Sequence, residues 1–178
     1  THLVWVSHVT GKRESRRVVG DYILREQDPT RPIRHEDETC TTTWRIDQHY
    51  PMEKNSQQYP GAEWLSEGVL TPIDFYALPY RCFYSKDVRN MFMAGRNISV
   101  THIALGSTRV MRTCGMIGEV VGMAASVCMK RNALPRDIYT TYFADLQELM
   151  RKGTGRTDVP YTQFYHQVDR TGHQAEDR

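Results

Sequence analysis

The hydrophobic and polar positions of this chain follow one pattern in its first half and another in its second. In the first half, apolar segments rich in β-branched and aromatic residues predict strands at 2–9, 18–24 and 41–47. Residues 69–84 are apolar and aromatic but contain two prolines, which favours extended, edge-like segments. The polar, proline-containing stretch 25–63 predicts a long irregular connection around the third strand.

After Asn90 the pattern predicts a strand, a loop and a helix in that order. The apolar run 91–94 is typical of a strand buried on both faces, as in a parallel sheet. Residues 95–107 are rich in turn-forming types and predict a loop. From 108 to about 131, apolar residues recur at three- and four-residue steps, which predicts a helix capped by Ser107 or Thr108.

Three glycines, Gly115, Gly118 and Gly122, lie inside the predicted helix 108–131. Each costs about 1 kcal/mol relative to alanine in a helix interior. We therefore expect this helix to pack closely against another backbone.

Two more helices and a polar tail are expected at the end of the chain. Pro135 and Asp137 suit a helix start, and the apolar stripe of 142–152 predicts an amphipathic helix that ends at Gly153. Few aliphatic residues follow, so 153–178 is expected to be a tail. The predicted class is α/β, with 91–94 in a mainly parallel sheet and helix 108–131 packed on it.

Composition and charge exclude several classes of protein. The chain has 178 residues, 39% hydrophobic and 25% charged, which suits about one soluble domain. Its net charge of +2 lacks the strong positive excess that is typical of nucleic-acid-binding domains, so no nucleic-acid partner is predicted. The longest apolar-rich run, 116–129, is too short to cross a bilayer and contains Glu119, so no membrane span is predicted. The sequence opens on Thr1 with no signal-peptide pattern, which indicates a processed or truncated start.

The four cysteines are widely spaced and form no CxxC or Cys/His cluster, so no metal site is predicted. Cys114 and Cys128 fall in the apolar pattern of helix 108–131 and are expected to be buried.

The strand, glycine loop and helix of residues 90–126 form the unit with the most chemical content. A glycine-rich entry to a helix lets a ligand approach the N–H groups and the positive end of the helix dipole. Gly95 would end the strand, and Gly106 would precede the helix start. This arrangement suits an anionic or electron-rich group, although an ordinary strand-to-helix connection explains the spacing equally well.

The same unit resembles the C-terminal FAD-contacting motif of flavoproteins with a glutathione-reductase-type cofactor domain. Its His102 and Gly106–Arg109 are placed like the His-containing loop and helix start of the succinate dehydrogenase/fumarate reductase branch. A closer resemblance, over about residues 2–150, is to a family of bacterial FAD-dependent oxidoreductases. Four segments show it: GKRESRRVVGDY (11–22), Trp-x-Ile-Asp-x-His (44–49), LPYRCFYS (78–85) and MAGRNISVTHIALGSTRVM (93–111).

The resemblance implies FAD as cofactor and hydride transfer between the flavin and an unidentified small organic or carbohydrate substrate. It implies cofactor contacts at Ala94, Gly95, Arg96, Asn97, Gly106, Ser107, Thr108 and Arg109. Arg96 replaces the acid that usually binds the ribityl chain, and Asn97 is the expected substitute. The implied organisation is a β-containing substrate region at 1–88, the C-terminal part of a Rossmann-like FAD domain at 89–152, and the tail at 153–178.

The dinucleotide-binding GxGxxG is absent from the 178 residues, and the one GxG, at 153–155, follows a predicted helix rather than a strand. The chain is therefore expected to be the C-terminal portion of a larger flavoenzyme, with a missing N-terminal FAD-binding half as its partner.

Three residues are candidates for catalysis. His102 lies in the glycine loop and has an imidazole suited to proton transfer. Arg109 stands in the first turn of the predicted helix, against the dipole, and can hold a carboxylate or the electron-rich edge of a flavin. Arg81 lies in an apolar segment and needs a partner there.

Asp47 and His49 share a face if their segment is a strand. They suit an acid-oriented imidazole base or two metal ligands, although an ordinary polar pair explains them too.

Two functions remain as alternatives to a flavoenzyme. The first is a polysaccharide-acting enzyme of the xanthan lyase type, in which Arg81, Tyr80 and His102 would act on a uronate. The second is a non-catalytic piece whose glycine-faced helix pairs with the missing half.

Overall fold

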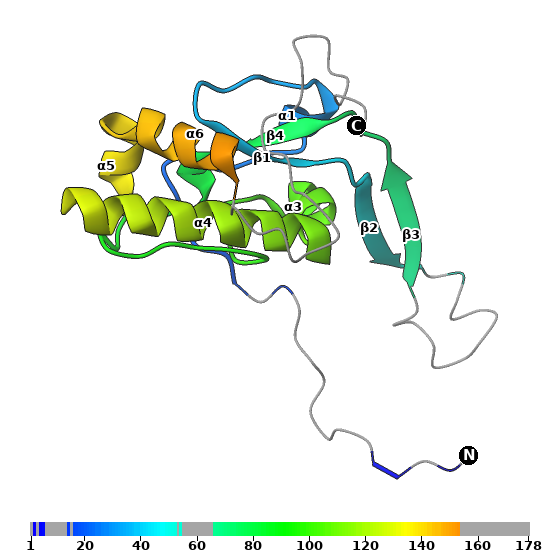
Figure 1. Ribbon diagram of the computed structural model, residues 1–178. Helices are drawn as coiled ribbons and strands as arrows, with labels where there is room; N and C mark the ends of the chain where they lie inside the picture. Colours follow the sequence, from blue (N-terminus) through cyan, green and yellow to red (C-terminus); the bar gives the residue numbers. More distant parts are fainter. Residues whose placement is uncertain are drawn as a thin grey trace.

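The computed structural model describes residues 16–52 and 66–153, together with His2, Val4, Trp5, Glu14 and Lys54. One short helix comes first, four antiparallel strands follow it, and the remaining helices complete this part of the chain (Figure 1). The strand expected at 2–9 lies mostly outside the described residues, and so does the tail beyond Gly153. The elements are α1 (Gln27–Thr30), β1 (Glu38–Thr42), β2 (Ile46–Pro51), β3 (Ser66–Thr71), β4 (Tyr76–Pro79), the 3-10 helix η1 (Tyr80–Cys82), α3 (His102–Thr108), α4 (Met111–Arg131), α5 (Pro135–Thr140) and α6 (Phe143–Lys152).

The strands form two separate antiparallel pairs, β1 with β4 and β2 with β3. The expected mainly parallel sheet is therefore wrong for the described residues, where the one parallel pairing is the isolated bridge Leu24↔Val100. Residues 91–94 do not form a regular strand: Phe92 makes an isolated antiparallel bridge to Tyr84. Met91 and Phe92 are only half-buried, so this run lacks the two covered faces that a central strand needs.

The expected strand 18–24 is an extended segment rather than a sheet strand. It lies against residues 97–101 through Val18 N–H to Asn97 O, Leu24 N–H to Ser99 O, and Thr101 N–H to Leu24 O. Gly20 is required here, because a Cβ at this position would come within 2.4 Å of the Arg81 carbonyl oxygen. The hydrogen bonds to 97–101 place the predicted glycine-containing loop, 95–107, next to the 18–24 segment.

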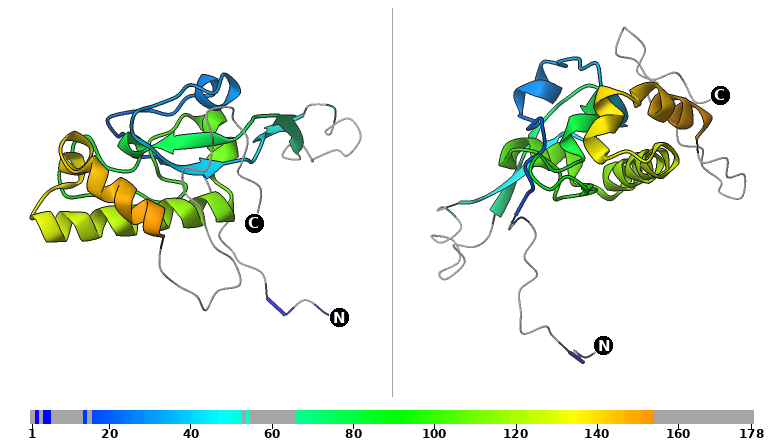
Figure 2. Two further views of the ribbon diagram at one scale, coloured as in Figure 1. Left: turned by 45° about the horizontal axis from the view of Figure 1, so that its top comes forward. Right: turned by 90° about the vertical axis from the view of Figure 1, so that its left-hand side faces the viewer.

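The expected strand 41–47 divides into β1 and β2, with residues 43–45 as the break. Both strands of the first pair are fully buried, whereas most residues of β3 are exposed. The β2–β3 pair extends beyond the body of the molecule (Figure 2).

The long predicted helix is confirmed as α4, but its start is different. His102–Thr108 lies inside the expected loop yet forms α3, whose cap Thr101 accepts a hydrogen bond from Ala104 N–H. Ser107 and Thr108 belong to the last turn of α3, so they do not cap α4, and Val110 occupies that position. The helices at 135 and 142–152 are confirmed as α5 and α6.

The hydrophobic core lies between α4, α5 and α6 and the β1–β4 pair. Ile117 and Val120 of α4 belong to this core together with Leu78 of β4, and Leu146 and Met150 of α6 complete it. These two α6 residues belong to the stripe that the sequence predicted. Gly153 ends α6 with a φ of 68°, a conformation that favours glycine.

The three glycines of α4 do not pack against another backbone within the described residues, where the sequence predicted close packing. A Cβ at Gly115, Gly118 or Gly122 would meet nothing within 4 Å. All three are exposed, as are Met111 and Met129 on the same helix. Part of α4 is therefore a bare, small-residue surface in the described structure.

The cysteine expectation is partly wrong. Cys114 and Cys128 are only half-buried, while Cys40 and Cys82 are buried in the core. Burial raises the pKa of the Cys40 thiol to about 12. Within the described ranges, no cluster of three His, Cys, Asp or Glu side chains is suited to a metal ion.

No single helix in the described part of the chain is long and apolar enough to cross a membrane. Helices α3 and α4 pass that test only together, as a pair bent by 89°.

Candidate functional site

The junction of α3 and α4 is the centre of the candidate site. The chain turns between the two helices at Arg109 and Val110, and α4 begins beside the β2–β3 pair (Figure 1). Gly106 brings α3 onto β2: a Cβ there would come within 2.7 Å of the Asp47 carbonyl oxygen and 2.9 Å of its nitrogen. Gln48 Nε2 donates to the Ile103 carbonyl oxygen at 3.0 Å across the same contact.

The N-terminus of α4 is open. No side chain caps it among the described residues, and its first residue, Met111, is 92% exposed. The first bond of the helix runs from Cys114 N–H to Val110 O. An α-helix has no internal acceptors for its first N–H groups, and these groups form the positive end of its dipole. This end of α4 is suited to a negatively charged or electron-rich group.

The glycine turn lies beside the first turn of α4. Gly95 has a φ of 90°, and a Cβ there would lie 3.8 Å from Cys114 Sγ. The charge of the neighbouring Arg96 also acts on the Cys114 thiol, lowering its pKa against the larger effect of burial. The Gly95 turn and the start of α4 therefore lie side by side, as a ligand site at this unit requires.

The backbone of 107–109 is used differently from what the sequence predicted. The Arg109 N–H donates to the Leu105 carbonyl oxygen at 3.0 Å, so it faces back into α3. Ser107 is buried, and its carbonyl oxygen accepts from Thr42 Oγ1 at 2.7 Å. The helix N–H groups suited to a ligand therefore begin after Val110. The buried Thr108 hydroxyl has no hydrogen-bond partner within the described structure.

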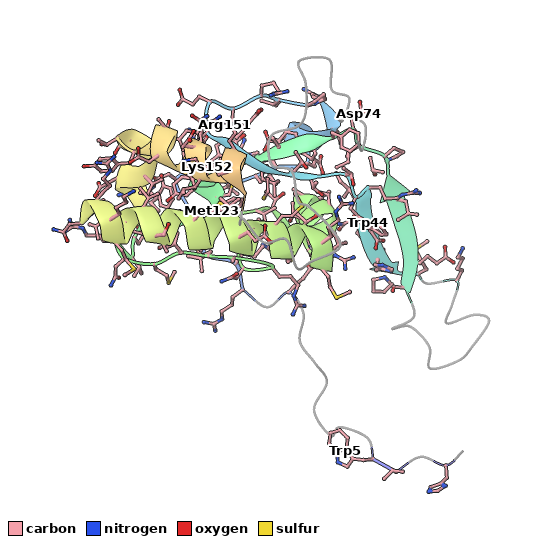
Figure 3. The ribbon with its side chains drawn as sticks, in the orientation of Figure 1. Trp5, Trp44, Asp74, Met123, Arg151 and Lys152 are labelled. Atoms are coloured by element: carbon pink, nitrogen blue, oxygen red, sulfur yellow. The ribbon has the colours of Figure 1, made fainter. Side chains whose placement is uncertain are left out.

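Arg109 joins Asp47 and His49 into one chain of contacts. Arg109 Nη2 donates to Asp47 Oδ2 at 3.2 Å and to the Asp47 carbonyl oxygen at 3.1 Å. Asp47 Oδ1 lies 3.1 Å from His49 Nε2. Asp47 and His49 lie on β2 two residues apart, so they share a face as the sequence predicted. The Trp44 side chain, 47% exposed, lies near the start of β2 at this end of the molecule (Figure 3).

His102 stands at the start of α3 and is paired. Its Nδ1 lies 2.7 Å from Glu14 Oε2, and more than half of the imidazole side chain is exposed. No spacing in the sequence indicates this contact, because Glu14 stands 88 positions before His102.

An open cavity of about 430 Å³ adjoins this pair, lined by Glu14, Arg16, Arg17, Val18, Val19, Ile23, Ser99 and Val100. The Ser99 hydroxyl is buried without a hydrogen-bond partner among the described residues. The cavity therefore combines cationic, apolar and hydroxyl groups next to the glycine loop.

The remaining loop candidates are mostly on the surface. Ala94, Arg96 and Asn97 are exposed, while Gly95 is half-buried. The Asn97 carbonyl oxygen accepts from Val18 N–H at 3.0 Å, which fixes the loop against the 18–24 segment. These side chains remain accessible to a cofactor.

Arg81 is held in a different place. Its Nε and Nη2 donate to both carboxylate oxygens of Asp37 at 3.0 and 2.9 Å, and its backbone N–H donates to the same group. The Tyr22 and Tyr139 rings lie 5.5 and 4.9 Å from its guanidinium. The hydrogen bonds to Asp37 raise the pKa of Arg81. The sequence predicted that this arginine needs a partner, but Asp37, 44 positions earlier, was not identifiable from spacing.

These observations define which group the site fits. The open helix end, the glycine turn and the orphaned Thr108 hydroxyl suit an electron-rich ring edge at the α3–α4 junction. The exposed polar side chains of 96–97 suit hydroxyl groups on an attached chain. Both features are those that a flavin and its ribityl chain need.

The comparisons with known proteins give one match. A family model described as FAD dependent oxidoreductase matches residues 1–150. No curated protein and no solved structure matches the chain.

Proposed function

The chain belongs to the FAD dependent oxidoreductase family, and we propose that it forms the flavin-facing, C-terminal portion of such an enzyme. FAD is the cofactor of this family. When bound, FAD accepts a hydride from an organic substrate at the flavin N5 or returns one. The chain's own residues position the reactants and supply the electrostatics.

The observation that supports this proposal most is the open N-terminus of α4 beside the Gly95 turn. Reduction of a flavin places negative charge on the pyrimidine edge of the ring. A helix N-terminus fixed in advance stabilises charge that develops during reaction. The residues that would hold this edge are those of the first turn of α4, Met111–Thr113, rather than the backbone of 107–109.

We assign roles to the other predicted contact residues from their positions in the structure. Ala94–Asn97 form the turn toward the ribityl chain, with Asn97 replacing the usual acid. Gly106, Ser107 and Thr108 shape the α3–α4 junction. Arg109 fixes Asp47 at the edge of the site. His102, with Glu14 as its orienting carboxylate, faces the substrate.

The partner in this proposal is an N-terminal FAD-binding half. The pyrophosphate of FAD needs a glycine-rich turn between a strand and a helix, and the 178 residues contain no GxGxxG. The bare glycine face of α4 provides a surface that another backbone can approach closely. We propose that the missing half packs there.

The experiment is an FAD titration followed by flavin fluorescence and visible absorption. The full-length protein is expected to bind FAD tightly, and the 178-residue chain alone weakly or not at all. Tight, stoichiometric FAD on the 178-residue chain would contradict this division of the cofactor site. A full-length protein that binds no FAD would contradict the flavoenzyme proposal itself.

Nothing in the described structure favours the polysaccharide-lyase alternative. That chemistry needs a cation for the uronate, and Arg81 already has both carboxylate oxygens of Asp37 as partners.

A further inference from the structure

The chain Arg109–Asp47–His49 has features that a plain surface ion pair lacks. Each Asp47 carboxylate oxygen has its own partner: Oδ2 accepts from Arg109, and Oδ1 faces His49 Nε2. Exposure increases along the chain, from 12% for the Arg109 side chain through 19% for Asp47 to 50% for His49. The orienting groups are covered, and the imidazole reaches solvent.

The position of Asp47 bears on which imidazole nitrogen is available to a substrate. In neutral histidine one ring nitrogen donates and the other accepts. Nε2 lies 3.1 Å from a carboxylate oxygen, a contact that suits the tautomer with the hydrogen on Nε2 and with Nδ1 as the acceptor. This orientation by a carboxylate is what an imidazole general base requires.

One close glycine contact keeps this arrangement in place. His49 pairs with Gly68 across the β2–β3 ladder, where a Cβ would make only ordinary van der Waals contact, 3.6 Å from His49 Cε1. Gly106 lets α3 press against Asp47, so that Arg109 reaches both its carboxylate and its carbonyl oxygen.

Asp47 and His49 lie next to the part of the site proposed for the flavin edge. Arg109, which holds the Asp47 carboxylate, is followed directly by Val110, the cap of α4. β2 packs on α3 at this junction.

We propose that His49 is a proton-accepting catalytic residue and that Asp47 and Arg109 are positioning residues. The inference rests on the proposed function. The substrate is an organic molecule in which the oxidised carbon bears an O–H or N–H group. Its C–H bond would break, and FAD, when bound, would take up the hydride with both electrons. The proton of the O–H or N–H moves to His49 Nδ1, and the C=O or C=N bond forms. Asp47 stabilises the imidazolium, which then loses the proton to water through its exposed edge.

The first test needs no substrate and uses ¹⁵N-labelled 178-residue chain in NMR. The expected result is a protonated, hydrogen-bonded Nε2 in His49 with a slowly exchanging proton, and an unprotonated Nδ1. In Asp47→Ala that proton is expected to exchange too fast for detection. Asp74→Ala is the matched control, because Asp74 is exposed and makes no hydrogen bond or ion pair with Asp47 or His49 in the described structure. A hydrogen on Nδ1 in the wild-type chain, or an Asp47→Ala spectrum identical to wild type, would overturn the proposal.

The second test uses the FAD-loaded full-length protein under anaerobic conditions with a panel of 2-hydroxy acids, sugar alcohols and primary amines. For a compound that bleaches the flavin, His49→Ala is expected to slow bleaching by about 10²–10⁴-fold. Added imidazole should restore part of the rate, which a purely structural role would not allow. Wild-type rates in His49→Ala with an intact flavin spectrum would reject His49 and leave the flavin proposal standing. Loss of FAD from the wild-type protein would instead reject the proposed function.

Discussion

Two arginine–aspartate pairs in this molecule, Arg81–Asp37 and Arg109–Asp47, differ in burial and in whether the aspartate contacts a further side chain. Arg81 and Asp37 form a bidentate pair in which Asp37 is fully buried and tyrosine rings flank the guanidinium. Arg109 uses one nitrogen for Asp47, which is partly exposed and passes the contact on to His49. We call Arg81–Asp37 the closed pair, because its contacts end at Asp37. It holds η1 to the segment before β1. We call Arg109–Asp47 the open pair, because its contacts continue from Asp47 to the solvent-exposed imidazole of His49. Residue type alone did not distinguish them in the sequence.

The largest expected effect is on the closed pair. Arg81→Ala should lower the free energy of unfolding by about 3–5 kcal/mol, because it leaves Asp37 buried without its cation. Urea denaturation followed by circular dichroism measures it. The double variant Arg81→Met/Asp37→Leu is the control and should recover much of the loss. An Arg81→Ala protein as stable as wild type would show that the pair is not structural.

The second effect concerns the glycine that brings α3 to Asp47. Gly106→Ala should destabilise the chain by about 1–3 kcal/mol, since its Cβ would overlap the β2 backbone. Gly118→Ala, on the bare face of α4, should instead stabilise the helix by about 0.5–1 kcal/mol. Thermal unfolding of the two variants compares them directly. Equal shifts in melting temperature would contradict the contrast between α3 and α4.

A third carboxylate, Glu119 of α4, has no arginine, and its buried oxygen lacks a hydrogen-bond partner in the described structure. Burial raises the pKa of Glu119 above its ordinary value of 4.5. The folded state therefore binds the proton more tightly than the unfolded state. Its contribution to stability is present at low pH and is lost as the pH rises from 4.5 through the raised pKa.

Glu119→Gln removes this titration and should raise the free energy of unfolding at neutral pH by less than about 1 kcal/mol, because solvent screens a carboxylate that is only partly buried. Chemical denaturation at a series of pH values above 4.5 tests the sign. A variant that is less stable than wild type at neutral pH would indicate that Glu119 has a partner when the protein is folded.

The smallest effect on stability is expected at the open pair. Arg109→Ala should change the free energy of unfolding by about 1 kcal/mol or less, because Asp47 remains partly hydrated. In the FAD-loaded protein, however, it should lower the flavin reduction potential and slow flavin reduction, with less effect on FAD binding. A spectroelectrochemical titration measures the potential. Normal potential and turnover in this variant would remove Arg109 from the site.

The sequence predicted correctly those elements that depend on the periodicity of neighbouring residues. The periodicity of 108–131 and 142–152 corresponds to α4 and α6, and the period of two put Asp47 and His49 on one face. Helix α3 was missed because it is short and contains Gly106, which a propensity argument assigns to a loop. Its helical form depends on contact with β2, which the sequence pattern does not show.

The candidate site was predictable only as a set of segments. The glycine turn at 95 and the helix start were found from residue types, but the start lies at Met111 rather than Thr108. The pairings Arg81–Asp37 and His102–Glu14 join residues far apart in the chain, so no spacing revealed them. The sheet was mispredicted for the same reason, because strand pairing depends on distant partners.

Amide hydrogen exchange in the FAD-loaded full-length protein and its apoprotein tests the central claim most directly. If the flavin edge lies against the first turn of α4, FAD should slow exchange at the Met111 and Thr113 amides. The amide of Arg109, already bonded to Leu105, should change less, and the α6 amides should serve as an unchanged reference. Equal exchange at Met111 and Thr113 with and without bound FAD would contradict the account.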